Sequence, residues 1–236
     1  MKFCSIILAR GGSKGLPRKN IIEFCSKPLL AWTVEHCIEG GATPVYVSSD
    51  SEEILGVGEQ YGAKSILRPE NISGDYATSE SGWLHALEII EAESGIMDWI
   101  LAPQVTSPLR TENDICNGLE LAASDKYDSL FSCSISEDIL FWGIHSKKLV
   151  SMNYEWKNRK RRQDFPKQYI ENGSFYLFRP EILRDNNNRF GGRIGMVEME
   201  FWKMFEIDSQ EDLRMCAAFM KDFSRGINLL ILGGKL

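Results

Sequence analysis

The sequence predicts a single α/β domain built on a mainly parallel β-sheet. Short apolar stretches alternate with segments of helical periodicity from residue 3 to about residue 133, as they do in consecutive β-α-β units. The first stretch, residues 3–9, contains no charged residue, which is typical of a strand covered on both faces of a sheet. A chain of 236 residues with 43% hydrophobic residues has the size and the apolar content of one such domain.

The elements follow in chain order from periodicity and end signals. Helical spacing of apolar residues begins behind Pro28 and stops at Gly40-Gly41, where glycine ends the helix. Thr111 and Ser209 each stand three residues before an aspartate, the pattern of a capped helix start. The other predicted elements are strands at 44–48, 64–67, 99–101, 129–133, 169–178 and 227–232, and helices from residue 50, through 83–90 and just before 186.

The alternation breaks between about residues 137 and 168. This stretch contains several aromatic residues without helical or strict two-residue periodicity, and then the basic cluster at 157–162. We therefore expect it to leave the main sheet.

Composition limits the classes of function. The net charge of −6 argues against a general nucleic-acid binder, so a site for an anion needs a local concentration of cations. The longest apolar runs fall short of the roughly 20 residues that span a bilayer, and no signal peptide precedes the first strand. The six scattered cysteines form no Cys-x-x-Cys pair, which is typical of reduced thiols. We expect a soluble, cytoplasmic protein that binds neither nucleic acid nor membrane.

Residues 10–20, behind the first strand, combine glycines with cations. Glycine lets backbone N–H groups turn toward an anion without obstruction by a Cβ atom. The loop suits a triphosphate, although it is neither a Walker P-loop nor a dinucleotide fingerprint. The alternative interpretation is a surface turn with solvated charges. The glycines are Gly11, Gly12 and Gly15, and the cations are Arg10, Lys14, Arg18 and Lys19.

The run Ala-Arg-Gly-Gly-Ser-Lys-Gly-x-Pro-x-Lys-Asn at 9–20 closely resembles the N-terminal signature of the CMP-sialate synthetases, the acylneuraminate cytidylyltransferases. The similarity extends from residue 6 to about residue 213. It implies one Rossmann-like nucleotidyltransferase domain over residues 1–236, with a dimerisation excursion at about 137–168. It also implies transfer of CMP from CTP to the anomeric hydroxyl of a nine-carbon 2-keto sugar acid, with Mg²⁺ as cofactor, in a homodimer whose active sites are shared.

Two other interpretations remain open. The chain could transfer a nucleotide to a different sugar, such as an eight-carbon acid or a sugar 1-phosphate. It could also be a non-catalytic nucleotide-binding protein, because Glu206 replaces an aspartate of the family pattern.

The resemblance places nucleotide binding on two segments. Triphosphate contacts fall on the loop, and Arg68 and Ser79 match positions near the ribose and base. For Ser79, capping of a helix is an equally good interpretation. The predicted nucleotide-binding residues are Arg10, Ser13, Lys14, Lys19, Asn20, Arg68 and Ser79.

Glu206 and Asp208 lie two residues apart, so an extended backbone would point both carboxylates to the same side. Taken alone, this pair is more often the solvated end of a strand. The resemblance makes both residues candidate Mg²⁺ ligands, with Asp208 the stronger candidate because the family has an Asp-x-Asp pair here. No general base is identifiable, although a metal-bound water or Asp208 could take the proton.

The basic cluster at 157–162 allows three interpretations: a nucleic-acid patch, a solvated charged run, or recognition of a carboxylate by forked guanidinium groups. Arg-Arg-Gln-Asp at 161–164 and Glu-Asn-Gly-Ser-Phe-Tyr at 171–176 resemble segments of the family and favour the third. The predicted sugar-binding residues are Gln104, Arg161, Arg162, Tyr176 and Phe190, and the predicted catalytic residues are Arg10, Lys19, Arg161 and Asp208.

Overall fold

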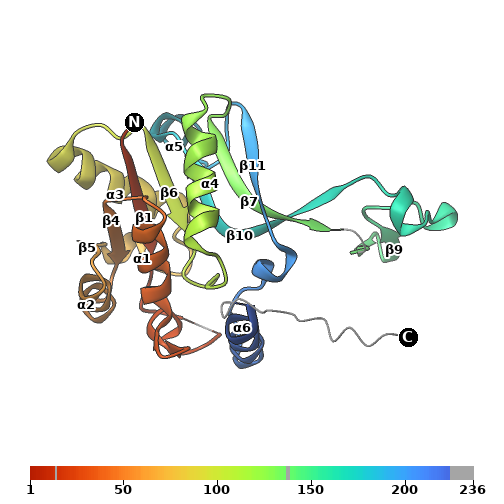
Figure 1. The fold of residues 1–236 in the computed structure, drawn as a ribbon, viewed down its shortest axis with the longest axis horizontal. Helices are drawn as coiled ribbons and strands as arrows, with labels where there is room; N and C mark the ends of the chain where they lie inside the picture. The colour runs from red at the N-terminus through yellow and green to blue at the C-terminus, as the bar shows by residue number, and fades with distance from the viewer. Residues whose placement is uncertain (14, 137–138, 224–236) are drawn as a thin grey trace, which may run out of the picture.

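A computed structural model describes residues 1–13, 15–136 and 139–223. It confirms the α/β class: a seven-stranded sheet has the order β11-β7-β10-β6-β1-β4-β5 (Figure 1). β10 runs antiparallel to both of its neighbours, and the other pairings are parallel. The strands are β1 (Phe3–Leu8), β4 (Val45–Ser49), β5 (Lys64–Leu67), β6 (Trp99–Pro103), β7 (Ser129–Ser136), β10 (Gln168–Phe178) and β11 (Ile194–Met199).

Helices cover both faces of this sheet. Neighbouring residues of β1 point to opposite faces, so Ile7 packs in one apolar cluster and Ile6 in the other. The first cluster holds side chains of α1 (Leu29–Glu39), α2 (Glu52–Gln60), α4 (Glu112–Ala123) and α6 (Gln210–Phe223). The second holds side chains of α3 (Ser79–Ser94) and α5 (Pro180–Asn186). The apolar run of β1 is thus explained by burial on both sides.

Two of the predicted helix starts are confirmed by their capping contacts. The backbone N–H of Thr111 donates to the Asp114 carboxylate at 2.7 Å, and the N–H of Ser209 donates to Asp212 at 2.8 Å. The capping role considered for Ser79 is wrong. Thr78 caps α3, because its hydroxyl accepts from the backbone N–H of Ser81 at 3.2 Å.

Some elements escaped sequence reasoning. β11 was missed because apolar residues occupy both its buried and its exposed positions, which hides the two-residue alternation. Two small hairpins were also missed: β2 (Glu23–Phe24) with β3 (Lys27–Pro28), and β8 (Trp142–His145) with β9 (Lys148–Ser151). The last predicted strand, at 227–232, lies outside the described residues. Short 3₁₀ helices lie at Lys19–Ile21, Glu70–Ile72, Trp156–Asn158, Arg162–Asp164 and Phe201–Met204.

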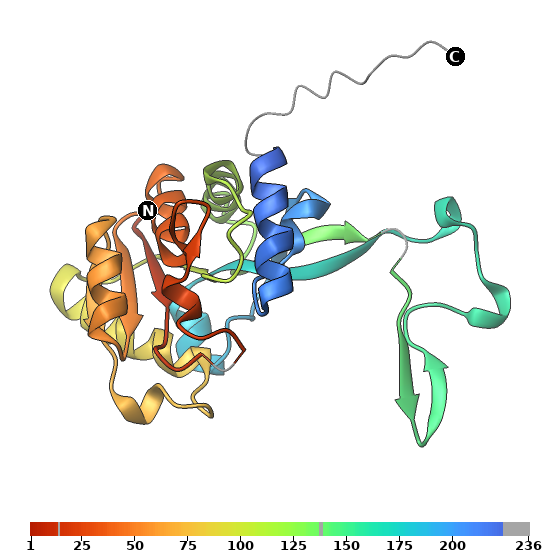
Figure 2. The ribbon, with the colours of Figure 1, turned by 90° about the horizontal axis from the view of Figure 1, so that it is seen from below.

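Residues 139–167, here called the arm, extend away from the sheet between β7 and β10 (Figure 2). The arm carries the hairpin of β8 and β9 and two of the short 3₁₀ helices. Several large apolar side chains on it are exposed to solvent: Phe141, Trp142, Ile144, Leu149, Val150, Met152 and Trp156. A patch of this kind is typical of a surface that meets another protein.

Within the described part of the chain, no helix has the length and apolar character needed to cross a bilayer.

Candidate active site

A pocket of about 450 Å³ opens at the ends of the parallel strands. Arg10, Arg68 and Gln104 line it, and they follow the carboxyl ends of β1, β5 and β6. This is the edge at which open α/β sheets bind their ligands. The pocket brings together the following residues that the sequence singled out: Arg10, Ser13, Lys19, Asn20, Arg68, Ser79, Gln104, Glu206 and Asp208.

The loop after β1 is held by one side chain at its own end and one that follows β4. The Asn20 side chain donates to the Arg10 carbonyl at 2.9 Å, and the N–H of Gly11 donates to the Asp50 carboxylate at 2.8 Å. Gly15 lies so close to the backbone of Asp208 that an added Cβ would stand 2.7 Å from its carbonyl oxygen. The loop therefore packs directly against the segment that carries the two carboxylates. Lys14 lies outside the described residues.

Two cations of the pocket are paired with exposed acids. The Arg10 guanidinium lies 3.1 Å from Asp75, and the Lys19 ammonium lies 2.6 Å from Asp208. Ion pairs with exposed partners contribute little to stability.

Arg68 is a third cation, and it is buried. Its Nε donates to the Ser73 hydroxyl at 3.1 Å, and one of its terminal nitrogens packs against Gly82 of α3. Burial lowers the pKa of Arg68, while the nearby Asp50 raises it. An arginine in this setting stays charged, so Arg68 supplies a fixed positive charge beside the loop.

The backbone fixes how Glu206 and Asp208 are presented. The N–H of Ile207 donates to the Thr106 carbonyl at 2.8 Å, and the Ile207 side chain is fully buried. The carboxylates on either side of Ile207 both line the pocket, as extended alternation requires. Burial raises the pKa of Glu206, and the negative charge of Asp208 raises it further.

The longer side chain of Glu206 has a matching space in β10. A carboxylate oxygen of Glu206 occupies the position that a Cβ on Gly173 would take. Gly173 has a φ of +66°, and the pairing of β10 with β7 is irregular at this point. The side chain of Glu206 thus fits against β10 because residue 173 has no Cβ atom.

These two carboxylates fit Mg²⁺ by the type of their donor atoms. Mg²⁺ prefers oxygen, commonly takes one or two carboxylates from a protein, and completes its shell with water and substrate phosphates. Among the described residues there is no group of three or more His, Cys, Asp and Glu side chains placed to hold a metal. The donor atoms of this pair are thus of the type that Mg²⁺ prefers.

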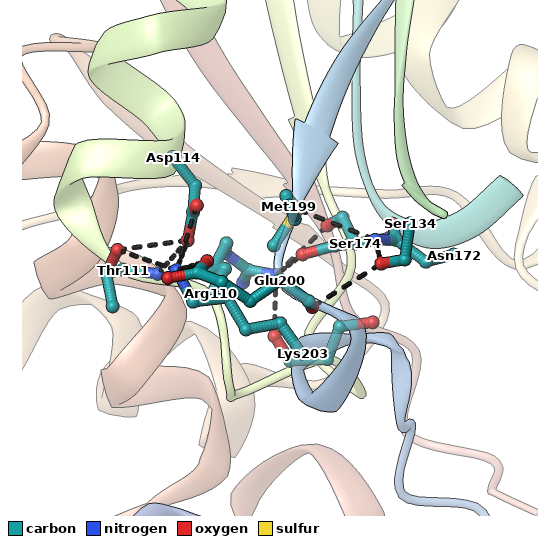
Figure 3. Close-up of polar contacts among 10 residues, drawn as sticks. Arg110, Thr111, Asp114, Ser134, Asn172, Ser174, Met199, Glu200 and Lys203 are labelled. Atoms are coloured by element: carbon teal, nitrogen blue, oxygen red, sulfur yellow. Dashed lines mark hydrogen bonds and ion pairs between the residues drawn. The ribbon is translucent and has the colours of Figure 1, made fainter. Parts of the chain in front are cut away.

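Buried polar contacts surround Arg110 and Lys203 (Figure 3). The Arg110 guanidinium donates to the carbonyls of Ser107 and Ser174 at 2.8 and 3.0 Å, and to the Thr33 hydroxyl at 2.5 Å. Beside it, the Lys203 ammonium lies 2.8 Å from the Asp114 carboxylate, with both side chains almost fully buried. Arg110 ties the loop after β6 to β10 and to α1, and the pair of Lys203 and Asp114 joins the segment before α6 to α4. Sequence reasoning missed these contacts.

Tyr176 and Phe190 lie next to the pocket. Their rings are 5.7 Å apart in an edge-to-face contact, and the Tyr176 hydroxyl donates to Glu171 at 2.6 Å. Burial raises the pKa of Tyr176, and the contact with Glu171 adds to this effect. Arg189, which the sequence did not single out, packs against Tyr176 and lines the pocket.

Arg161 and Arg162 do not line the pocket within the described part of the chain, because they lie on the arm. The Arg161 guanidinium pairs with Asp164 at 2.7 Å. Within one copy of the chain, these two arginines therefore do not join the other predicted site residues in the pocket.

Residues 4–225 match a protein family described as cytidylyltransferase. The chain belongs to the cytidylyltransferase family. It is 32% identical over 225 residues to a pseudaminic acid cytidylyltransferase of Campylobacter jejuni, covering 94% of this chain and 97% of that protein. It is also 32% identical over 212 residues to N-acylneuraminate cytidylyltransferase A of Danio rerio, covering 88% of this chain and 48% of that protein.

Solved structures show a similar fold at lower identity. A CMP:2-keto-3-deoxy-manno-octonic acid synthetase complexed with CTP matches with a TM-score of 0.69 and 14% identity, over 94% of this chain and all of that one. A 4-diphosphocytidyl-2C-methyl-D-erythritol synthase from Anaerococcus prevotii matches with a TM-score of 0.63 and 14% identity, over 93% of this chain and 99% of that one. These likenesses concern the fold.

Proposed function

We propose that this cytidylyltransferase transfers CMP from CTP to the anomeric hydroxyl of a nine-carbon 2-keto sugar acid and releases pyrophosphate. The observation that carries the proposal is the composition of one pocket. Cations of the loop after β1, the buried Arg68, two carboxylates and Gln104 all line the same cavity. Attack of a hydroxyl on the α-phosphorus of a triphosphate needs positioned cations for the leaving pyrophosphate and a place for the acceptor beside them.

The choice of acceptor is supported by the relatives of similar sequence. The two relatives at 32% identity are named for pseudaminic acid and for N-acylneuraminate, and both are sugar acids. The resemblance at 161–164 and 171–176 points to the same class. We infer that the acceptor is a nine-carbon acid of the sialic type, and that the reaction takes place in the cytoplasm, since all six cysteines are free thiols.

A panel assay tests this function. Pyrophosphate release is measured with CTP and each of N-acetylneuraminate, its deaminated analogue, legionaminate, pseudaminate, an eight-carbon 2-keto acid and a sugar 1-phosphate. We expect the highest kcat/KM for one of the nine-carbon acids. Preference for the eight-carbon acid or the sugar 1-phosphate would replace the proposed acceptor, and nucleotide binding without turnover of any acceptor would point to a non-catalytic protein.

Mg²⁺ is the cofactor we propose for this reaction. Asp208 and Glu206 would hold it, and the ion would supply positive charge to the phosphates of CTP. Lys19 contacts Asp208 and so orients this carboxylate from the loop side.

Lys19→Ala and Arg10→Ala are each expected to lower kcat by about 100-fold, with a smaller rise in the KM for CTP. Negative charge accumulates on pyrophosphate in the transition state, so these cations contribute most at that stage. Steady-state kinetics with varied CTP give both constants. Arg18→Ala is the matched control, because Arg18 is on the same loop, pairs with Glu53 and does not line the pocket. Values within threefold of wild type for both Lys19→Ala and Arg10→Ala would contradict the role of the loop.

We further propose that two chains form a homodimer through their arms, each arm completing the active site of the other chain. The exposed apolar side chains of the arm support an interface. The arm extends away from the sheet, and Arg161 and Arg162 on it do not line the pocket of their own chain, which supports a role in the pocket of a second copy (Figure 2). In such a dimer these arginines would meet the carboxylate of the acceptor.

Arg161→Ala or Arg162→Ala is therefore expected to weaken acceptor binding by about 1.5–3 kcal/mol and to leave CTP binding nearly unchanged. Mixing an Arg161→Ala, Arg162→Ala double variant with a Lys19→Ala variant gives heterodimers in which one of the two sites carries no substitution. Recovery of about half of the wild-type activity per heterodimer is the expected result. Subunit exchange without any recovery would rule out sharing of the sites.

A further inference from the structure

Arg189 is a cation of the pocket that neither the loop nor the arm supplies. It follows α5 and precedes β11, and it lines the pocket together with Trp83 of α3. Its guanidinium carbon lies 4.6 Å from the centre of the Trp83 ring and 4.6 Å from the centre of the Tyr176 ring. Two aromatic contacts at this distance restrict a guanidinium to a narrow range of positions.

Glu80 fixes the orientation of Arg189. Its carboxylate oxygen lies 3.1 Å from Nε and 3.0 Å from a terminal nitrogen of the guanidinium. Only 20% of the Arg189 side chain and 14% of the Glu80 side chain are exposed. The pair is thus more enclosed than Arg10 with Asp75, where the exposed fractions are 37% and 44%. Its geometry is set before any substrate binds.

The order of the strands places Tyr176, against which Arg189 packs, two strands away from the strand that precedes the triphosphate loop. That loop follows β1, and Arg68 follows β5, on one side of the sheet order. Tyr176, against which Arg189 packs, belongs to β10, which lies beyond β6 on the other side of β1. Gln104, the predicted acceptor residue at the end of β6, lies between these two regions of the sheet. Arg189 therefore belongs to the acceptor half of the pocket.

The surroundings of Arg189 favour a neutral polar group over a second anion. Glu80 already balances its charge, and a carboxylate of the substrate beside it would face Glu80 in an enclosed place. A secondary amide matches better, because its carbonyl accepts from a guanidinium N–H while its alkyl part packs against aromatic rings. Trp83 lines the pocket here, and Tyr176, on which Arg189 also packs, contacts the ring of Phe190.

We propose that Arg189 is a specificity-determining residue that donates a hydrogen bond to the carbonyl oxygen of an acylamino substituent on the acceptor sugar, with Glu80 as its positioning residue. This inference rests on the proposed function, since it assigns a part of the acceptor to a part of the same pocket. A hydrogen bond from Arg189 to an acyl carbonyl makes the enzyme select for acylated amino sugars among acids that share the same carboxylate and anomeric centre.

The experiment compares one acid with analogues that each differ from it in a single group. The acid is the one with the highest kcat/KM in the panel, and in each analogue one acylamino group is replaced by a hydroxyl. The enzyme variant is Arg189→Met with Glu80→Gln, so that no carboxylate is left enclosed without its partner. We expect the kcat/KM ratio of acylated acid to one hydroxyl analogue to fall by about 10- to 100-fold, the range of a hydrogen bond to a charged group. The KM for CTP should stay within twofold.

A matched control uses a second arginine that pairs with a glutamate of α3. Arg184 of α5 pairs with Glu91, and neither residue lines the pocket. Arg184→Met with Glu91→Gln should leave the ratio within twofold. Arg189→Lys, which keeps the charge but lacks the planar fork, should lower the kcat/KM ratio by at least threefold. This variant tests the inference if the double variant does not fold.

The outcomes are distinguishable. If wild-type enzyme turns over the acids but the ratio is unchanged in both Arg189 variants, this inference is wrong and the proposed function stands. A rise in the KM for CTP with an unchanged ratio would place Arg189 on the nucleotide and likewise overturn the inference. If wild-type enzyme turns over no nine-carbon acid, the proposed function fails, and the inference fails with it.

Discussion

Asp208→Asn is expected to abolish Mg²⁺-dependent turnover, with a loss of at least about 100-fold in kcat. The amide keeps the size of the side chain but removes the charge that meets Lys19 at 2.6 Å and that would hold the metal ion. Glu206→Asp is expected to keep or improve turnover, because it retains the charge and shortens the side chain that now fills the space beside Gly173. The measurement is the rate of pyrophosphate release as a function of Mg²⁺ concentration.

Glu211→Gln provides the control for this prediction. It makes the same change of carboxylate to amide in the first turn of α6, on an exposed residue that does not line the pocket. Its activity should stay within twofold of wild type. Wild-type activity of Asp208→Asn at limiting Mg²⁺ would mean that another group holds the metal.

Lys203→Met is expected to lower the free energy of unfolding by about 3–5 kcal/mol. Only 5% of the Lys203 side chain and 6% of the Asp114 side chain are exposed, so the substitution leaves a buried carboxylate without its cation. Urea unfolding followed by tryptophan fluorescence measures the change. The double variant Lys203→Met, Asp114→Asn should recover part of the loss, since asparagine carries no charge yet still offers an oxygen to the N–H of Thr111.

Arg18→Met is the comparison for an exposed pair. Arg18 and Glu53 have side chains that are 68% and 58% exposed, and their pairing should contribute less than about 1 kcal/mol. Equal losses of stability for Lys203→Met and Arg18→Met would show that burial does not decide the contribution of the Lys203 pair.

The parts of the site that sequence reasoning could predict are those encoded locally. Arg10, Ser13, Lys19 and Asn20 follow a buried strand within one short segment, and the end of a parallel strand is where a ligand binds. Glu206 and Asp208 share a side because they flank one buried residue. Neither prediction needed knowledge of what lies across the fold.

The parts that sequence reasoning missed depend on partners far apart in the chain. Arg189 meets Glu80 across 109 residues, Lys203 meets Asp114 across 89, and Arg110 meets Thr33 across 77. Each of these cations would pass for a surface residue in the sequence, and only the packing of the helices on the sheet buries it. The antiparallel direction of β10 follows from the arm, because the arm returns the chain at the edge of the sheet where β7 ends and no crossover intervenes.

Phosphorus NMR of a reaction containing the enzyme, CTP, Mg²⁺ and the preferred nine-carbon acid tests the central claim most directly. We expect the three signals of CTP to be replaced by pyrophosphate and by one phosphodiester signal, from CMP joined to the anomeric oxygen of the acid. Formation of pyrophosphate together with free CMP, or CTP that persists unchanged beside every nine-carbon acid, would contradict transfer of CMP to a sugar acid.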